Sequence, residues 1–247
     1  MNESRKHSLA LDYHENTKSI VGSSIYDEKT EYKIYPNAKT VSLKQNNPNM
    51  ANDSFIKTLL SRKSTRAFTS AHVKLDILAQ LLTLSCGQRN GDDLLDFYRT
   101  YASAGTRYPI EVYIVIFSAC DIEQGIYHYN IKDNSLELIK RGDYSKQFRD
   151  IYKNQESFIA TDYPCLILFS MVFERTMQKY GERGYRFILL DAGHMSQNLY
   201  LTATYLGLGI VALGAGATSD KKIDDILGLV SSQENVFYGF ALGHPQS

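Results

Sequence analysis

The chain has 247 residues, and 27 lysine and arginine side chains balance 27 aspartate and glutamate side chains, so the formal net charge is zero. This balance argues against a general polyanion binder, because nucleic-acid affinity rests on a surplus of positive charge facing phosphates. Hydrophobic residues make up 43% of the chain and charged residues 22%, which is typical of a folded globular protein rather than a disordered one.

The amino-terminal residues 1–52 are polar and show no sustained hydrophobic period, which predicts an irregular arm before a folded domain over residues 53–247. Within that domain, hydrophobic periodicity and capping residues predict helices at four places. They are expected from Asp53 or Ser54 through Leu60, around Leu75 to Leu82 with a stop near Gly87, over Arg183 to Leu206, and from a cap near Ser219.

Runs of β-branched and apolar residues predict the strands. They are expected at Ile110 to Phe117, in a hairpin over Gly125 to Lys140 that turns at Asp133-Asn134, at Pro164 to Phe169, at Ile210 to Leu213 and at Asn235 to Leu242. Helices and strands are mixed without regular βαβ alternation. The sequence therefore favours an α+β domain, with a central mixed or antiparallel sheet flanked by helices, over a doubly wound fold.

The cysteines, histidines and apolar segments limit the compartment and the chemistry. Cys86, Cys120 and Cys165 are too few and too widely spaced for a disulfide framework or a zinc site, and the six histidines form no HExxH motif. No apolar run approaches the roughly 20 residues that span a bilayer, and no signal-peptide core is present. We therefore expect a cytoplasmic protein without a bound metal or a membrane segment.

The segment SRKSTRAF, residues 61–68, is a candidate phosphate site. Arg62 and Arg66 are four residues apart and would share one face if the segment were helical, where like charges repel unless an anion lies between them. Ser64 and Thr65 add hydroxyl donors. The alternative interpretation is a solvated basic helix end, since basic residues at helix carboxyl termini are ordinary.

Two further segments carry candidate chemistry. Small residues at 102–105 in RTYASAGTRYP would let the backbone approach a flat ligand, although this segment can equally be an ordinary turn that enters a strand. In FERTMQKYGERGYR, Lys179 beside Tyr180 is a possible acid/base pair, because a desolvated lysine can lose its proton and a tyrosine near a cation ionises more easily. The alternative for this pair is a pair of surface residues.

These motifs occur in a recognisable order. SRKSTRAF, RTYASAGTRYPIEVYIV, GIYHYN, FERTMQKYGERGYR and LLDAGHMSQNLYLTATYLGLGIVALGA together resemble the SagB-type dehydrogenases of the nitroreductase superfamily, over about residues 55–244. Those proteins are azoline oxidases of thiazole/oxazole-modified peptide biosynthesis. The resemblance implies a nitroreductase-like fold that binds FMN at the interface of a homodimer.

The resemblance also assigns roles to individual residues. It implies that Lys179 and Tyr180 remove a proton during azoline oxidation, while hydride passes to the flavin and dioxygen serves as the reoxidant. The residues implied to hold FMN are Arg62, Ser64 and Arg66 at the phosphate and ribityl end, Ser103, Ala104 and Gly105 along the ring, Gln197 and Asn198 near the cofactor, and Gly214 and Ala215 through their backbone.

Some features depart from the family pattern or leave the function open. Ala102 stands where proline is frequent, and Thr106-Arg107 replaces a small apolar pair, so Arg107 could alter the substrate pocket. The short arm leaves open whether the chain recognises a leader peptide itself or relies on a cyclodehydratase complex. The alternatives to azoline oxidation are a general NAD(P)H-dependent nitro- or quinone reductase and a non-catalytic scaffold subunit of a peptide-modification complex.

Overall fold

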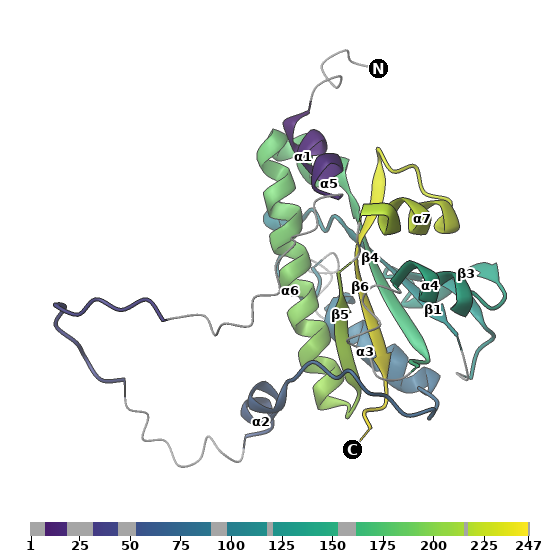
Figure 1. The fold of residues 1–247 in the computed structure, drawn as a ribbon, viewed down its shortest axis with the longest axis horizontal. Helices are drawn as coiled ribbons and strands as arrows, with labels where there is room; N and C mark the ends of the chain where they lie inside the picture. Colours follow the sequence, from purple (N-terminus) through teal and green to yellow (C-terminus); the bar gives the residue numbers. More distant parts are fainter. Residues whose placement is uncertain are drawn as a thin grey trace.

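The computed structural model describes residues 8–18, 32–43, 53–89, 98–117, 121–152, 162–214 and 217–246. It confirms the α+β class, with one sheet between two groups of helices (Figure 1). The strands are β1 (Ile110–Ile116), β2 (Gly125–Asn130), β3 (Ser135–Arg141), β4 (Cys165–Val172), β5 (Gly209–Leu213) and β6 (Glu234–Gly243). The helices are α1 (Leu9–Thr17), α2 (Ser54–Ser61), α3 (Leu75–Cys86), η4 (Ala104–Thr106), α4 (Ser145–Tyr152), α5 (Phe173–Tyr180), η6 (Gly181–Arg183), α6 (Gly184–Tyr205) and α7 (Ala217–Leu227).

The sheet is antiparallel throughout, in the order β3-β2-β1-β4-β6-β5. Strands β1 and β4 occupy its centre, where Ile114 pairs with Ile167. Successive side chains of a strand point to opposite faces, so Val112 and Ile114 enter one hydrophobic core while Tyr113 enters the other. Burial on both faces explains why β1 is apolar through most of its length.

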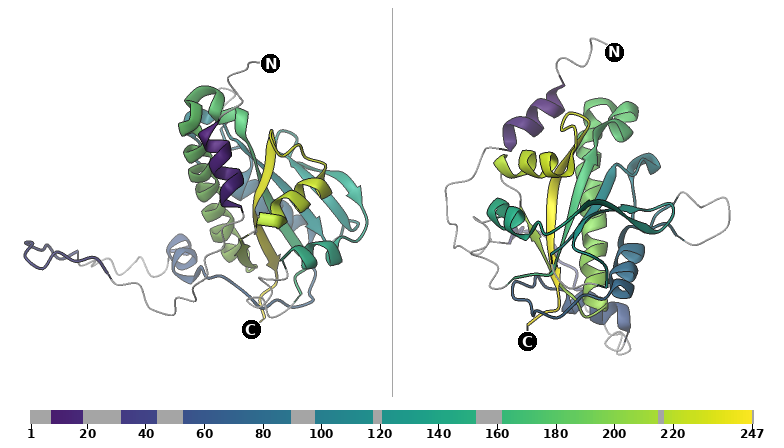
Figure 2. Two further views of the ribbon diagram at one scale, coloured as in Figure 1. Left: turned by 45° about the horizontal axis from the view of Figure 1, so that its top comes forward. Right: turned by 90° about the vertical axis from the view of Figure 1, so that its right-hand side faces the viewer.

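The two cores use different helices. Leu78 of α3 and Ile188 of α6 pack on one face of the sheet, whereas Phe148 of α4 and Ile223 of α7 pack on the other. Figures 1 and 2 show α1 and α6 on one side of the sheet and α4 and α7 on the opposite side. Across the ranges that the structure describes, no helix has both the length and the apolar character needed to cross a membrane.

The local signals that predicted the ends of α2, α3 and α6 are confirmed, whereas α7 begins at Ala217, ahead of the cap expected near Ser219. Asp53 caps α2, because its side chain accepts hydrogen bonds from the backbone N–H groups of Phe55 (2.8 Å) and Ile56 (3.2 Å). Helix α3 ends before Gly87, and α6 spans nearly all of the predicted long helix. These boundaries depend on neighbours in the sequence, so they could be predicted from it.

The prediction of irregular structure over residues 1–52 is wrong for residues 9–17, which form α1. Distant polar partners hold this helix. Glu182 accepts hydrogen bonds from Ser8 Oγ (2.9 Å) and from the Ala10 N–H (2.6 Å), and buried His14 lies between Tyr185 Oη (3.0 Å) and Asn235 Oδ1 (2.7 Å). A helix that is anchored by polar contacts lacks a wide apolar stripe, which explains why its sequence shows no clear period.

Candidate active site

A tight turn over residues 103–108 leads into the central strand β1. Three of its residues have left-handed backbone angles, namely Gly105 (φ 59°), Thr106 (φ 56°) and Tyr108 (φ 45°). Glycine adopts this conformation freely, but threonine and tyrosine adopt it only where their surroundings hold them there. The shape of the turn therefore depends on contacts with the rest of the protein.

Helix α5 brings Lys179 and Tyr180 against this turn. A Cβ atom added to Gly105 would lie 2.5 Å from Tyr180 Oη and 2.8 Å from Lys179 Nζ, closer than real Cβ contacts. Lys179 Nζ lies 5.3 Å from the centroid of the Tyr180 ring. The structure thus brings together two groups of predicted site residues that are far apart in the sequence, and the absence of a side chain at Gly105 makes the approach possible.

Helix α6 holds the beginning of the turn through a buried carboxylate. Asp191 is 2% exposed, and it accepts hydrogen bonds from Ser103 Oγ (2.5 Å) and from the Ala104 N–H (3.1 Å). Burial raises the pKa of Asp191, although the two hydrogen bonds oppose that effect. The side chain of Ser103, one of the predicted cofactor ligands, is therefore also an internal link between the turn and α6.

The same helix contacts the residues just before the turn. The Asn198 side-chain amide donates a hydrogen bond to the Thr100 carbonyl (3.0 Å), and His194 Nδ1 lies 3.1 Å from the Ala102 carbonyl oxygen. With Asp191, these side chains occur at spacings of three and four along α6, which places them on one face. Asn198, predicted to lie near the cofactor, thus also fixes the approach to the turn.

Helix α5 anchors the other end of the turn. Arg175 donates a hydrogen bond to the Tyr108 carbonyl (3.1 Å) and forms an ion pair with Glu111, and Glu111 also accepts from His128 Nε2 (2.9 Å). Burial alone would raise the pKa of Glu111, but the hydrogen bond with His128 and the charge of Arg175 outweigh burial and lower it. Glu111 is therefore a carboxylate that fixes Arg175, and the turn is held from two helices.

Residues 62–67 form neither helix nor strand, so the expected helical face shared by Arg62 and Arg66 does not form. Helix α2 ends at Ser61, and Thr65 N–H donates a hydrogen bond to the Ile210 carbonyl of β5 (2.9 Å), which draws the segment along the sheet edge. The Arg62 guanidinium lies 5.4 Å from the centroid of the Tyr200 ring on α6. No ion pair among the residues that the structure describes involves Arg62, Lys63 or Arg66.

The remaining predicted cofactor residues are distributed along α6 and β5. Gln197 is exposed on α6, Gly214 is exposed directly after β5, and Ala215 lies outside the described residues. Tyr200, which contacts Arg62, follows Asp191 by nine residues, or about 13 Å along the helix axis. A single ligand that uses both the turn and the arginine segment must therefore be elongated.

Sequence reasoning missed Asp191 and Arg175. Asp191 follows Ile188 by three residues and precedes Met195 by four, so an acidic residue occupies the apolar stripe of α6. A carboxylate in such a position requires hydrogen-bond donors, which was the available signal. Arg175 carried no comparable signal, because its partners Tyr108 and Glu111 come from a distant segment.

The part of the chain that the structure describes offers neither a metal centre nor an exposed cysteine. Within the described ranges, no three His, Cys, Asp or Glu side chains are grouped so that they could hold a metal ion. Burial raises the pKa of the Cys86 thiol to about 12, so this thiol stays protonated near neutral pH.

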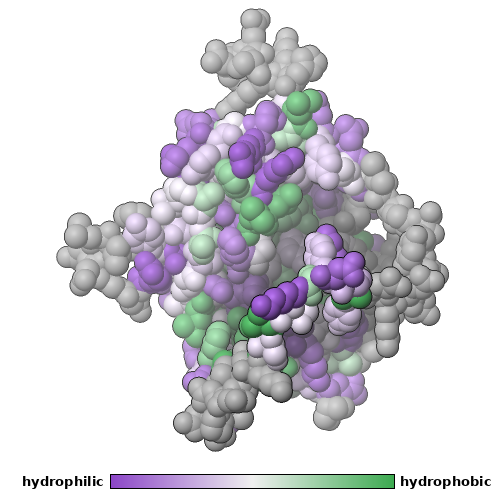
Figure 3. All heavy atoms as spheres, turned by 90° about the vertical axis from the view of Figure 1, so that its left-hand side faces the viewer, coloured by the Kyte–Doolittle hydropathy of each residue, from purple (hydrophilic) through white to green (hydrophobic). Residues whose placement is uncertain are grey.

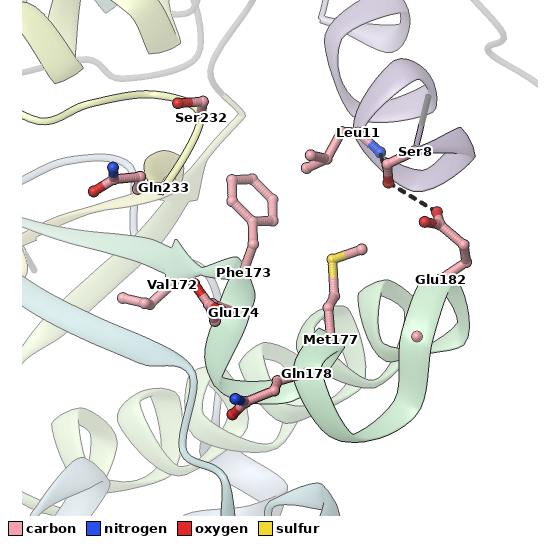
Figure 4. A pocket seen from close by; sticks show the side chains of 11 residues that line it. Ser8, Leu11, Val172, Phe173, Glu174, Met177, Gln178, Glu182, Ser232 and Gln233 are labelled. Carbon is pink, nitrogen blue, oxygen red and sulfur yellow. Dashed lines mark hydrogen bonds between the residues drawn. The ribbon is translucent and has the colours of Figure 1, made fainter. Parts of the chain in front are cut away.

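A separate pocket of about 520 Å³ lies where α1 meets α5 and the start of η6. Figure 4 shows Leu11, Phe173 and Met177 pointing toward its interior, with the Ser8–Glu182 hydrogen bond at its edge. Neither Lys179 nor Tyr180 lines it. The pocket therefore adjoins α5 without including the predicted acid/base pair.

Apolar side chains also gather on the exposed side of α6. Leu190, Leu201 and Tyr205 share one face of this helix, and Leu190 is 58% exposed. Figure 3 shows apolar side chains on the side of the molecule that carries α2 and α6. A groove of about 240 Å³, which we call the α2–α6 groove, is lined by Ser54, Phe55, Thr58, Leu84, Leu201, Thr202 and Tyr205.

Several known proteins are similar to this chain. The profile of the nitroreductase family matches residues 59–244. MJ1384 of Methanocaldococcus jannaschii, which carries a nitroreductase name, is 32% identical over 169 residues, covering 68% of this chain and 81% of MJ1384. The microcin B17-processing protein McbC of Escherichia coli is 30% identical over 114 residues, covering 44% of this chain and 42% of McbC.

A solved structure extends the similarity of fold over nearly the whole chain. It is a chain of the E. coli microcin synthetase McbBCD complex with truncated pro-MccB17 bound. The TM-score is 0.75 at 20% sequence identity, and the match covers 96% of this chain and 92% of that chain. At this identity, the similarity establishes the fold.

Proposed function

Because the chain belongs to the nitroreductase family, we propose that it is an FMN-dependent dehydrogenase that oxidises thiazoline or oxazoline rings of a peptide to thiazoles or oxazoles. The observation that carries this proposal is the convergence of Lys179 and Tyr180 on the turn at Gly105. Two side chains that could exchange protons pack there against a turn of small residues whose backbone could lie along a flat ligand.

The residues present fit FMN at both of its ends. Arg62 and Arg66, which lack an anionic partner among the described residues, would hold the phosphate together with Ser64. The turn Ser103–Gly105 would lie along the ring system. Gln197, Asn198 and the backbone of Gly214 and Ala215 would complete the site. When bound, FMN supplies the hydride acceptor that protein side chains lack.

In this proposal, the protein removes a proton from the azoline ring and orients that ring. Oxidation of an azoline to an azole removes one proton and one hydride from adjacent ring atoms. Lys179 or Tyr180 would take the proton. FMN, held by the residues named above, would supply the hydride acceptor, and dioxygen is the proposed terminal electron acceptor. The absence of a side chain at Gly105 lets Lys179 Nζ and Tyr180 Oη pack closely against the turn.

The proposed partners follow from the relatives and from the surface. McbC is named for the processing of microcin B17, and the McbBCD structure is a multi-subunit synthetase, which supports a peptide substrate and work within a cyclodehydratase complex. The exposed apolar residues of α6 and the α2–α6 groove support a homodimer in which this face is covered.

Two measurements test the proposal. The visible absorption spectrum of the purified protein should show bound flavin, and an azoline-containing peptide should lose two hydrogens per ring by mass spectrometry in the presence of dioxygen. Lys179→Ala combined with Tyr180→Phe should abolish that loss while flavin remains bound. A purified protein without flavin would favour the scaffold alternative. NAD(P)H-dependent reduction of nitro or quinone compounds that survives the double substitution, without azoline oxidation, would favour the general reductase.

A further inference from the structure

Asp191 links α6 to the turn that carries Gly105, and it does so with both carboxylate oxygens. Oδ2 accepts the hydrogen bond from Ser103 Oγ (2.5 Å), and Oδ1 accepts the hydrogen bond from the Ala104 N–H (3.1 Å). Ser103 Oγ in turn accepts from the Tyr108 N–H (2.8 Å). The Asp191 carboxylate is thus linked to backbone groups at both ends of the turn, directly at Ala104 and through the Ser103 hydroxyl at Tyr108.

The turn needs such an anchor, because its own hydrogen bonds are few. Within the turn, the Thr106 N–H donates to the Ser103 carbonyl (3.1 Å), and the Arg107 N–H makes a longer bond to the Ala104 carbonyl (3.4 Å). Thr106 and Tyr108 are held at positive φ, where non-glycine residues are strained. The hydrogen bonds to Asp191 therefore help to hold the turn at these backbone angles.

The position of Gly105 decides how Lys179 and Tyr180 stand beside the proposed flavin site. Gly105 directly follows Ala104, and its Cα faces Tyr180 Oη and Lys179 Nζ so closely that no Cβ fits. A shift of the turn would therefore alter the distance between the proposed base and the ring that it deprotonates. Reaction rates fall steeply with such misplacement.

We propose that Asp191 is a positioning residue for the reaction: acting through Ser103 and Ala104, it holds the turn at Gly105 against Lys179 and Tyr180. The hydrogen bonds that Asp191 makes end on the turn, so its effect on the reaction is exerted through the turn. The effect that Asp191 is expected to have on catalysis rests on the proposed function. The anchoring of the turn stands on the hydrogen bonds alone.

The test compares Asp191→Ala, Asp191→Asn and Ser103→Ala with Ser196→Ala as the matched control. Ser196 is a buried polar residue on the same helix, and its hydroxyl donates a hydrogen bond to the Ala192 carbonyl one turn earlier (2.6 Å). The side chain introduced by Asp191→Asn would keep an oxygen that can accept from the Ala104 N–H. It lacks the second acceptor for Ser103, so this variant should rescue part of the effect.

Two readouts are expected to change in the Asp191 variants. Hydrogen–deuterium exchange of the peptide containing residues 103–108 should be at least about tenfold faster in Asp191→Ala than in Ser196→Ala. The kcat for azoline oxidation should fall by about 100-fold with the KM for the peptide changed less than about threefold, and Asp191→Asn should recover part of the kcat. A merely structural defect would instead weaken substrate and flavin binding together with kcat.

Each outcome bears on the inference. Unchanged exchange in Asp191→Ala, or faster exchange with wild-type kcat, would overturn it. If Asp191→Ala does not fold, wild-type kcat in both Asp191→Asn and Ser103→Ala would overturn it as well. If the wild-type protein binds FMN but oxidises no azoline, the proposed function fails, whereas the exchange measurement still decides whether Asp191 anchors the turn.

Discussion

Substitution of Gly105 by alanine is the sharpest test of the site geometry. The new Cβ would lie 2.5 Å from Tyr180 Oη and 2.8 Å from Lys179 Nζ. To reach an ordinary contact of 3.4 Å, the tyrosine oxygen must retreat by roughly 0.9 Å and the lysine nitrogen by roughly 0.6 Å. Both are far ends of side chains that can move, so the protein should still fold.

The expected magnitudes can be stated separately for stability and for activity. At φ 59°, an alanine costs about 1–2 kcal/mol of backbone strain, which corresponds to a decrease in Tm of roughly 2–8 °C for a chain of this size. A displacement of the proposed base approaching 1 Å should lower kcat by up to about 100-fold. Thermal unfolding and peptide mass spectrometry measure the two effects.

Gly228→Ala is the matched control for backbone strain. Gly228 also has a left-handed backbone (φ 78°), but a Cβ there would meet nothing within 4 Å. We expect a similar loss of Tm and a kcat close to that of the wild type. If Gly105→Ala lowers kcat no more than Gly228→Ala does, Lys179 and Tyr180 do not act from their position beside the turn, and the reasoning is refuted.

Three further predictions concern the cofactor, a buried acid and the dimer. Arg62→Ala with Arg66→Ala should weaken FMN binding at least about tenfold in a fluorescence titration, since a hydrogen bond to a charged group contributes about 1.5–3 kcal/mol; unchanged affinity would exclude the phosphate site. Burial raises the pKa of the Asp220 carboxyl from 3.8 to about 7. The free energy of unfolding should therefore fall as the pH rises from 3.8 to about 7, because ionisation of this carboxyl is less favourable in the folded protein than in the unfolded chain. The free energy of unfolding of Asp220→Asn, measured with urea, should therefore exceed that of the wild type by an amount that grows by about 2 kcal/mol between pH 5 and pH 8. A difference that is independent of pH would contradict this. Leu190→Glu should convert the proposed homodimer to a monomer in light scattering, whereas Val230→Glu, an equally exposed site on the loop before β6, should not; dimers in both variants would place the interface elsewhere.

Most of the elements of the fold could be predicted because their signals are local. Asp53 ahead of α2 and Gly87 after α3 mark helix ends through bonds to residues only a few positions away. Strand β1 shows the apolar run that burial on both faces requires. Helix α1 was missed because Glu182 and Asn235, which anchor it, are far away in the sequence.

The candidate site could be predicted only as separate motifs. Lys179 and Tyr180 were identified beside each other, and Gly105 was identified in another segment, but only the packing of α5 against the turn brings them into contact. The expected helical face shared by Arg62 and Arg66 does not form, because the chain leaves the helix at Arg62 and Thr65 N–H donates a hydrogen bond to the distant Ile210 carbonyl of β5. Such long-range pairing leaves no trace in a local pattern.

The sequence by itself determined the chemistry that the chain can offer: cations for a phosphate, a small-residue turn, and a lysine beside a tyrosine. These follow from residue types and spacings of a few positions. The tertiary structure decided which of these groups meet and what holds them. Asp191 looks like an isolated acid in an apolar helix until the fold places the Ser103 hydroxyl and the Ala104 N–H against it, because a buried carboxylate persists only where distant donors satisfy it.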